Sequence, residues 1–203
     1  MSFDQKNSFE TEPQIATGLA SPEDVKEIVR LQQENLEPHV STEEKATQGY
    51  VSLETPAELL EKIVGDEGII VAKSADQLVG YLIPMTLDKA KGLPFFAPLI
   101  GQLDKLQLDG KPLDTYNLCV LAQICINKQF RGGEAVMQIH RATNNHLKDQ
   151  YDLGVTEISD INKRSLRANI DKIGMIDVGQ FEANGITWHV VVTDFRKLRE
   201  AEE

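Results

Sequence analysis

Cysteine is scarce in this chain: its 203 residues include two, Cys119 and Cys125. Both stand in one extended apolar run, six positions apart, so we expect them on the same face of a single strand. At that separation along a straight strand the two sulfur atoms lie beyond disulfide reach. The sequence therefore predicts two buried reduced thiols, which are usual in a cytosolic protein.

Long hydrophobic runs are also missing, and none approaches the length that a helix needs to cross a bilayer. The first residues, MSFDQKNSFETEP, lack the basic segment and the apolar segment of a secretory leader. The chain also has fewer basic than acidic residues: 21 Lys and Arg compared with 32 Asp and Glu, which gives a net charge of −11. We therefore expect a cytoplasmic protein that binds neither nucleic acid nor membrane surfaces.

Histidine is present at four positions, His39, His140, His146 and His189, without the spacing of a metal site. His140 and His146 are six apart in a predicted helix and so lie on different faces. We expect packed or surface histidines and no metal. No histidine follows Cys125 at a supporting position, so we interpret it as a core thiol rather than a nucleophile.

The length and an apolar share of 41% suit one globular domain with a full hydrophobic core. We expect a flexible N-terminal tail over 1–13, a single domain over 14–195 and a polar C-terminal end over 196–203.

Two helix starts are marked by capping residues. Ser21-Pro-Glu-Asp24 supplies a cap and a proline at the first helical position, and Thr55-Pro-Ala-Glu58 has the form of a capping box. Apolar residues at helical spacing follow each pattern, and Gly65 ends the second helix.

Extended segments alternate with polar turns over the rest of the chain. The order predicts an α/β domain with a mainly antiparallel sheet that contains one parallel strand–helix–strand unit. The expected elements are a hairpin over 68–83, a short apolar helix within 93–103, a tight turn at Asp109-Gly110, an apolar strand over 116–126 covered on both faces, a helix to about Lys148, a strand over 154–158, a helix over 162–173 ended by Gly174, and a hairpin at Asn184-Gly185.

The stretch NKQFRGGEAVMQIH, residues 127–140, predicts a strand end, a glycine turn and a helix start. A helix N-terminus offers unpaired N–H groups and partial positive charge, glycines allow an anion to approach the backbone, and Arg131 adds a cation. The stretch is therefore either an anion cradle or an ordinary turn.

The order of elements around this turn resembles the GNAT family of N-acetyltransferases over about 14–194. The matching segments are Gln123-Ile-Cys-Ile126 with Phe130-Arg-Gly-Gly133, Glu157-Ile-Ser-Asp-Ile-Asn162-Lys-Arg-Ser165, and Lys172-Ile-Gly174-Met175 before a strand. The resemblance implies a GNAT-like central sheet of about six to seven strands, splayed between strands four and five and flanked by helices.

It also implies acetyl-CoA, or another acyl-CoA, as co-substrate, held between 116–126 and 154–158 without a metal. The pyrophosphate would rest on the turn, and the pantetheine arm would pair with the fourth strand. The residues implied in binding are Ile124, Cys125, Ile126, Phe130, Arg131, Gly132, Gly133, Glu134, Ala135, Asn162 and Ser165.

Glu134 departs from the family pattern Arg-Gly-x-Gly-x-Gly/Ala. In the gapless register it takes the place of the second glycine, and a carboxylate within about 5 Å of the diphosphate costs roughly 3 kcal/mol per charge pair. In a register with one residue deleted, Gly133 is the second glycine, Ala135 is the small third residue, and Glu134 points to solvent. The sequence leaves both registers open.

Acyl transfer to an amine needs an oxyanion donor, a base for the amine and an acid for the thiolate. The backbone N–H near Ile124 is the expected oxyanion donor. Glu157 or Asp160 is a candidate base acting through water, and the alternative for each is a structural ion pair with Lys163, Arg164 or Arg167. Many relatives carry a tyrosine acid in the helix after Asn162, but Asn169 and Ile170 stand there in this chain, and Tyr116 and Tyr151 are the substitute candidates.

Three functions follow as hypotheses: an N-acetyltransferase acting on a small-molecule or peptide amine, a non-catalytic acyl-CoA binder, or a protein-interaction domain that uses the apolar segment 93–103. A homodimer is compatible with each of them.

Overall fold

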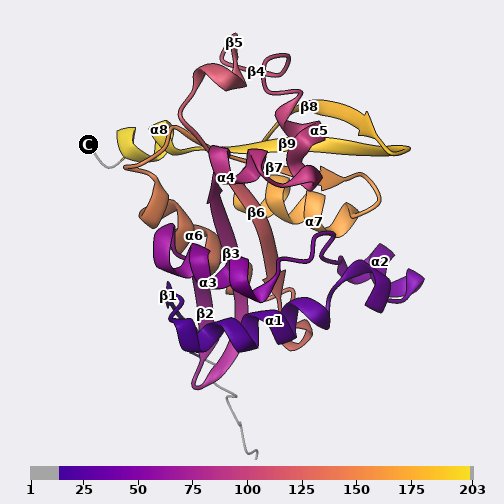
Figure 1. The fold of residues 1–203 in the computed structure, drawn as a ribbon, viewed down its shortest axis with the longest axis vertical. Coiled ribbons are helices and arrows are strands. Elements are labelled where there is room, and N and C mark those ends of the chain that lie inside the picture. Colours follow the sequence, from indigo (N-terminus) through magenta and orange to yellow (C-terminus); the bar gives the residue numbers. More distant parts are fainter. Residues whose placement is uncertain (1–13, 202–203) are drawn as a thin grey trace, which may run out of the picture.

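The structure is a computed structural model that describes residues 14–201, apart from the side chains of residues 46 and 47. The tail expected over 1–13 lies outside the described residues. One seven-stranded sheet crosses the molecule, with helices on both faces (Figure 1). Its strands, in spatial order, are β1 (Ala16–Leu19), β2 (Ile70–Ser74), β3 (Gln77–Thr86), β6 (Leu118–Ile126), β7 (Leu153–Ser159), β9 (Ile186–Asp194) and β8 (Ile176–Ala183).

Every neighbouring pair in this sheet is antiparallel except β6 and β7, which are parallel. The parallel pair is the predicted strand–helix–strand unit, with its crossover helix between the two strands in sequence. The expected α/β fold with a mixed, mostly antiparallel sheet is confirmed. A separate small hairpin is formed by β4 (Gln107–Leu108) and β5 (Lys111–Pro112).

Helices cover the sheet in two groups. The helices are α1 (Val25–Gln33), α2 (Thr42–Gln48), α3 (Ala57–Asp66), α4 (Leu87–Lys91), α5 (Ala97–Ile100), α6 (Ala135–Leu147), α7 (Lys163–Arg167), which continues as a π-helical turn (Ala168–Ile173), and α8 (Phe195–Glu200). One face packs against α1, α3 and α5 in a first core, and the other packs against α6 and α8 in a second core. The C-terminal end expected to be polar over 196–203 begins as α8, and its neighbour Phe195 is fully buried.

The sheet opens between β6 and β7. These strands pair only from Leu118 to Val120, opposite Leu153 to Val155, and then diverge. The register between β3 and β6 shifts at the same level, because Leu121 faces Pro84 and Gln123 faces Ile83, so Ala122 has no partner. Proline has no N–H to give to a ladder, and a bulge beside it bends the strand. The bulge therefore marks the start of the opening, which we call the gap.

The bulge also corrects the prediction for the two cysteines. Cys119 lies in the second core and Cys125 in the first, on opposite faces of β6. One extra residue between the two cysteines shifts the alternation of side chains by one position. Two residues an even number of positions apart then lie on opposite faces of the strand. Both thiols are free and buried, as predicted, and burial raises the pKa of each to about 12.

Turn glycines are predicted well. Asp109-Gly110 and Asn184-Gly185 both have positive φ at both residues, as a tight hairpin turn requires, and each joins two strands. Gly174 adopts a left-handed conformation and ends the π-helical turn.

The helix starts are predicted less well. The capping box at Thr55 is wrong: α3 begins after Pro56, and the Thr55 hydroxyl is buried without a hydrogen-bond partner. The Gln32 side chain of α1 instead forms hydrogen bonds with both backbone groups of Thr55. Gln32 Nε2 donates to Thr55 O at 3.0 Å, and Gln32 Oε1 accepts from the Thr55 N–H at 2.9 Å. Conversely, a true capping box at Ser41 and Glu44 starts α2.

The apolar residues of 93–103 belong to this chain's own core. Phe96, Leu99 and Leu103 are all buried in the first core, beside the gap. Consequently these three side chains are not a contact surface for another protein.

Candidate active site

Two adjoining cavities occupy the gap. The larger one, about 450 Å³, lies toward the open ends of the strands, and the smaller one, about 90 Å³, lies toward the point where β6 and β7 meet. They share six lining residues: Tyr50, Val51, Ile124, Asn162, Ser165 and Asn169. All the predicted cofactor-binding residues line the larger cavity except Glu134 and Ala135.

The edge of β6 presents backbone groups to the gap. The N–H of Asn127 donates to Val79 O on the β3 side at 2.7 Å. Because N–H groups alternate along a strand, those of Ile124 and Ile126 point the other way, toward β7. The ladder to β7 has already ended at Val120, so the Ile124 amide faces the cavities.

The N-terminus of α6 closes one end of the larger cavity. Gly132 has φ of 87°, a conformation that favours glycine, and it turns the chain into the helix. Glu134 is the N-cap residue, but its side chain caps no backbone N–H. The first N–H groups of α6 therefore have no intrahelical partner and lie beside Gly132 and Gly133, which line the cavity.

The Glu134 side chain is exposed and is not part of the cavity wall, whereas Ala135 is buried in the second core. This arrangement matches the register with one residue deleted, in which Glu134 points to solvent and Ala135 is the small residue. Val136, one position further on, does line the cavity.

Arg131 holds the turn in place rather than pointing its charge at the cavity. Its guanidinium donates to Ile126 O at 3.0 Å, to Gln48 O at 3.0 Å and to Asn35 Oδ1 at 2.5 Å. The side chain thus ties the end of β6 to α1 and α2. We expected the Arg131 side chain to supply a cation to the anion site, but its guanidinium is bound to these three acceptors instead.

Other cations line the same cavity. Arg164 belongs to α7, as does Arg167, and Lys172 belongs to the π-helical turn. The Arg164 guanidinium lies 3.8 Å from the point where a Cβ on Gly132 would stand. In a chain of net charge −11, this gathering of cations around backbone amides favours an anionic ligand.

Asn162 connects three segments at the junction of the cavities. It caps α7, accepting from Ser165 N–H at 3.3 Å, and its Nδ2 donates to Tyr50 O at 3.3 Å. A Cβ on Gly49 would stand 3.0 Å from Asn162 Oδ1, and Gly49 has φ of 73°. The absence of a side chain at Gly49 therefore allows the segment after α2 to lie close to Asn162 at the gap.

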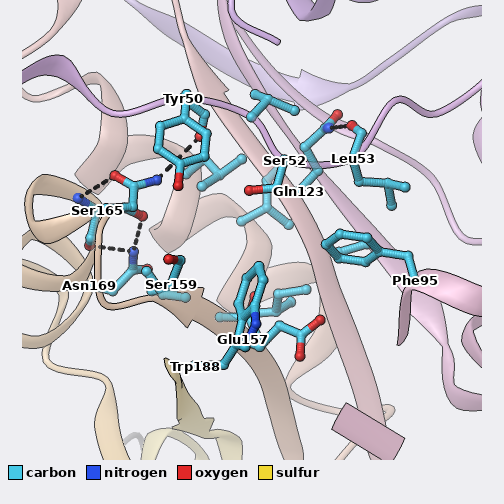
Figure 2. Close-up of a pocket in the computed structure, with 18 of the residues that line it drawn as sticks. Tyr50, Ser52, Leu53, Phe95, Gln123, Glu157, Ser159, Ser165, Asn169 and Trp188 are labelled. Atoms are coloured by element: carbon cyan, nitrogen blue, oxygen red, sulfur yellow. Dashed lines mark hydrogen bonds between the residues drawn. The ribbon is translucent and has the colours of Figure 1, made fainter. Parts of the chain in front are cut away.

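Tyr50 lines both cavities and stands at this junction. Burial raises the pKa of Tyr50 above its ordinary value, and the charges of Glu37 and Asp160 raise it further. Figure 2 shows the Tyr50 ring directed at Ser159 and Ser165. The sequence analysis assigned no element just before this residue and missed it, although the capping box at Ser41 marks a helix there.

Glu157 lies on β7 in the wall of the smaller cavity. Among the residues that the structure describes, its carboxylate has neither an ion-pair nor a hydrogen-bond partner, so the pairs with Lys163, Arg164 or Arg167 that the sequence allowed are not formed. Burial raises the pKa of Glu157 to about 8. A carboxyl group with this pKa can change protonation state near neutral pH.

Aromatic rings flank this side of the smaller cavity. Phe95 and Trp188 meet edge to face, with centroids 6.2 Å apart and planes at 87°, and Phe96 meets Phe95 at 5.1 Å. In Figure 2 the Glu157 carboxylate points to the side of the cavity where Phe95 and Trp188 stand. Trp188 had no signal in the sequence beyond its place in a strand.

His140 of α6 lines the smaller cavity from the opposite face of the sheet. Both ring nitrogens are buried without a hydrogen-bond partner, and burial lowers the pKa of His140 to about 4. Of the two alternatives that the sequence left open, packed or surface, His140 is packed, and it is neutral at physiological pH.

Tyr116, the candidate acid, is not brought to the site. It precedes β6 at the end where β6 and β7 are still paired, so it lies away from the gap. Its hydroxyl donates to Leu108 O at 2.7 Å, and its ring packs against the Arg196 guanidinium at 4.7 Å.

No three His, Cys, Asp or Glu side chains within the described part of the chain gather as a metal ion would require. Over the same residues, no helix has the length and apolarity to cross a membrane.

Several solved structures share this fold. An N-acetyltransferase from Staphylococcus aureus Mu50 is 12% identical, with a TM-score of 0.59 over 90% of this chain and 99% of that chain. A GNAT-family acetyltransferase from Streptococcus pneumoniae is 13% identical, with a TM-score of 0.59 over 89% and 99%. The protein yncA from Salmonella typhimurium, solved with its cofactor acetyl-CoA, is 11% identical, with a TM-score of 0.57 over 89% and 94%.

No family model matches the chain, and no curated protein matches it in sequence. The chain has the fold of the GNAT acetyltransferases, as the resemblance of its motifs predicts. At these identities the likeness concerns the fold, so the activity has to be argued from the site.

Proposed function

We propose that this protein is an acyl-CoA-dependent N-acyltransferase that transfers acetyl from acetyl-CoA to a primary amine in a ternary complex. One observation carries the proposal: in one continuous wall, the larger cavity joins free helix N–H groups, an open strand edge, and the cationic side chains of Arg164, Arg167 and Lys172. A diphosphate needs the first two features, and an amide-containing arm needs the third.

The residues present fit acetyl-CoA. The N–H groups at the start of α6 would hold the pyrophosphate, with Arg164 and Lys172 offering further donors. The open edge of β6 at Ile124 and Ile126 would pair with the pantetheine amides. Glu134, which is exposed and outside the wall, would not oppose the phosphates.

Acetyl-CoA, when bound, supplies an acyl group activated as a thioester. The Ile124 N–H would donate to the carbonyl oxygen as negative charge develops there. Glu157, directly or through a water, would take the proton that the amine loses as its nitrogen forms the new bond to the acyl carbon. Tyr50 would give its hydroxyl proton to the departing sulfur, which fills the role left vacant at Asn169 and Ile170.

Isothermal calorimetry with acetyl-CoA and with CoA tests the binding part. We expect saturable binding, and a ligand at about one hundred times its dissociation constant should stabilise the protein by about 2.7 kcal/mol. Absence of heat and of a thermal shift at millimolar ligand would reject the proposal.

A matched pair of variants locates the ligand. Val136→Glu places a carboxylate in the cavity wall and should weaken CoA binding about a hundredfold, as a charge pair at about 5 Å predicts. Glu134→Gln removes a carboxylate that points away and should leave the affinity unchanged. Equal effects of the two substitutions would show that the phosphates do not lie at the α6 N-terminus.

A non-catalytic acyl-CoA binder is the second candidate, favoured by the lack of a tyrosine at Asn169 and Ile170. Release of free thiol from acetyl-CoA across a panel of amines separates the two. If Tyr50 is the acid, Tyr50→Phe should lower kcat about a hundredfold while CoA binding stays unchanged. Binding without turnover by the wild type would leave the binder as the function.

A further inference from the structure

The two cavities differ in the charged side chains that line them. The described wall of the larger one has one acidic residue, Asp171, and four cationic residues, Arg131, Arg164, Arg167 and Lys172. Around the smaller one, the described residues include no Lys or Arg, and Glu157 is the one acidic side chain. A ligand group in the smaller cavity therefore meets a single carboxyl group and no cation.

Sheet register places an aromatic ring beside that carboxyl group. Glu157 pairs with Val190 and Ser159 pairs with Trp188, so Glu157 and Trp188 are diagonal neighbours on the same face of β7 and β9. Diagonal neighbours lie within reach of long and aromatic side chains. Figure 2 agrees, since Glu157, Trp188 and Phe95 stand together at one end of the cavity.

Phe95 and Trp188 form a corner, because their planes meet at 87° with centroids 6.2 Å apart. Leu53 and Phe96 extend the apolar wall. Such walls take up an apolar or aromatic body, and the ring faces also attract a cationic ammonium group.

On the basis of the proposed function, we propose that the acceptor is an arylalkylamine: a primary amine on a short chain attached to an aromatic ring, with no anionic group near the nitrogen. The amine nitrogen lies beside Glu157, and the ring packs into the corner of Phe95 and Trp188. In the balanced reaction, the nitrogen bonds to the acyl carbon, the bond from that carbon to sulfur breaks, and one amine proton leaves through Glu157, while the thiolate takes up the proton given by the acid.

Amino acids are excluded by charge. The carboxylate of an amino acid is one carbon from the amine, so it would lie within about 5 Å of Glu157. Above about pH 8, where Glu157 is ionised, the repulsion corresponds to roughly a hundredfold in affinity at an effective dielectric near 20. No cation of the smaller cavity, as far as the structure describes its wall, offsets this repulsion. Polyamines are poorer acceptors because the described wall has no second carboxylate for their second ammonium group, and attraction to the ring faces offsets only part of the hydration that this group loses.

The test is acetyl transfer from acetyl-CoA to 2-phenylethylamine and to phenylalanine, which differ by one carboxylate, with spermidine as the third amine. At about pH 9, where Glu157 is ionised, we expect kcat/KM for 2-phenylethylamine to exceed that for phenylalanine by about a hundredfold or more. Trp188→Leu should raise KM for 2-phenylethylamine about tenfold with little change in kcat, and Trp188→Phe should restore it. Unchanged thermal unfolding of both variants checks the fold.

Turnover of phenylalanine or spermidine at an equal or higher rate would overturn this proposal while the acyltransferase function stands. An unchanged KM in Trp188→Leu would also overturn it. Failure of acetyl-CoA to bind in calorimetry would instead remove the proposed function itself, so the two failures are distinguishable.

Discussion

Replacing Glu157 by glutamine should change how stability depends on pH. Burial raises the pKa of Glu157 from an ordinary value of 4.5 to about 8 in the folded protein. The unfolded chain loses this proton near 4.5, so between the two values the folded state holds a proton that the unfolded state does not. The contribution of Glu157 to stability is therefore complete below about pH 4.5 and is lost as pH rises toward about pH 8.

The magnitude follows from the size of the shift. A change from 4.5 to about 8, at 1.36 kcal/mol for each pKa unit, corresponds to about 5 kcal/mol. Glutamine has nearly the same shape and does not titrate, so Glu157→Gln removes this pH dependence. The variant should be close to the wild type in acid and more stable by up to about 5 kcal/mol in mild alkali.

Urea unfolding at about pH 5, 7 and 9 measures this, as the difference in unfolding free energy between variant and wild type. The difference should increase steadily across this range. Glu182→Gln, at an exposed position on β8, is the control. A difference that is the same at all three pH values would refute the reasoning, because it would mean that Glu157 titrates alike in both states.

Three further substitutions test the surroundings of the gap. His140→Leu removes two buried nitrogens that lack hydrogen-bond partners and should stabilise the protein. The gain should be largest in acid, because the unfolding free energy of the wild type falls by about 3 kcal/mol as the pH drops from 6.5 toward 4. Equal urea midpoints for the two proteins at low pH would contradict this. Arg131→Met removes three hydrogen bonds and should cost about 3 kcal/mol in ligand-free thermal unfolding, whereas a surface arginine would cost almost nothing. Gly80→Ala puts a Cβ 2.7 Å from Cys125 O and should destabilise the protein by about 3 kcal/mol or more. Gly18→Ala is the control, because a Cβ there has open space around it and should leave the stability unchanged. Similar melting temperatures for the two variants would refute the close packing at Gly80.

Much of the fold was predictable because its signals are local. The Asn184-Gly185 and Asp109-Gly110 turns need positive φ, which glycine and asparagine or aspartate tolerate, so a dipeptide is enough to find them. The apolar strand over 116–126 and the helix after the glycine turn follow from hydrophobic pattern in the same way. The start of α2 could also have been found, since Ser41 and Glu44 form a capping box.

The error over the cysteines has a different cause. Cys119 and Cys125 reach opposite faces of β6 because one extra residue, Ala122, stands in the bulge between them. The bulge lies opposite Pro84, which belongs to β3 and is distant along the chain. No pattern within 116–126 therefore reveals it, and an argument from spacing alone places both thiols on one face.

The functional site was also hard to predict from local patterns. The sequence does not reveal which tyrosine lies at the gap. Tyr50 does, whereas Tyr116 lies at the end of β6 that is still paired with β7, because that pairing ends at Val120. The Arg131 side chain was expected to face an anion, but three oxygen acceptors from other segments hold it elsewhere.

The sequence by itself therefore determined the central strands, the two hairpin turns and the position of the glycine turn before α6, since each depends on neighbours along the chain. Only the tertiary structure decided that Glu134 points to solvent, that Glu157 lies half-buried in the wall of the smaller cavity, and that Trp188 stands beside it. The direction, burial and partners of a side chain depend on strands that are distant in sequence and adjacent in the sheet, and those contacts exist only once the chain has folded.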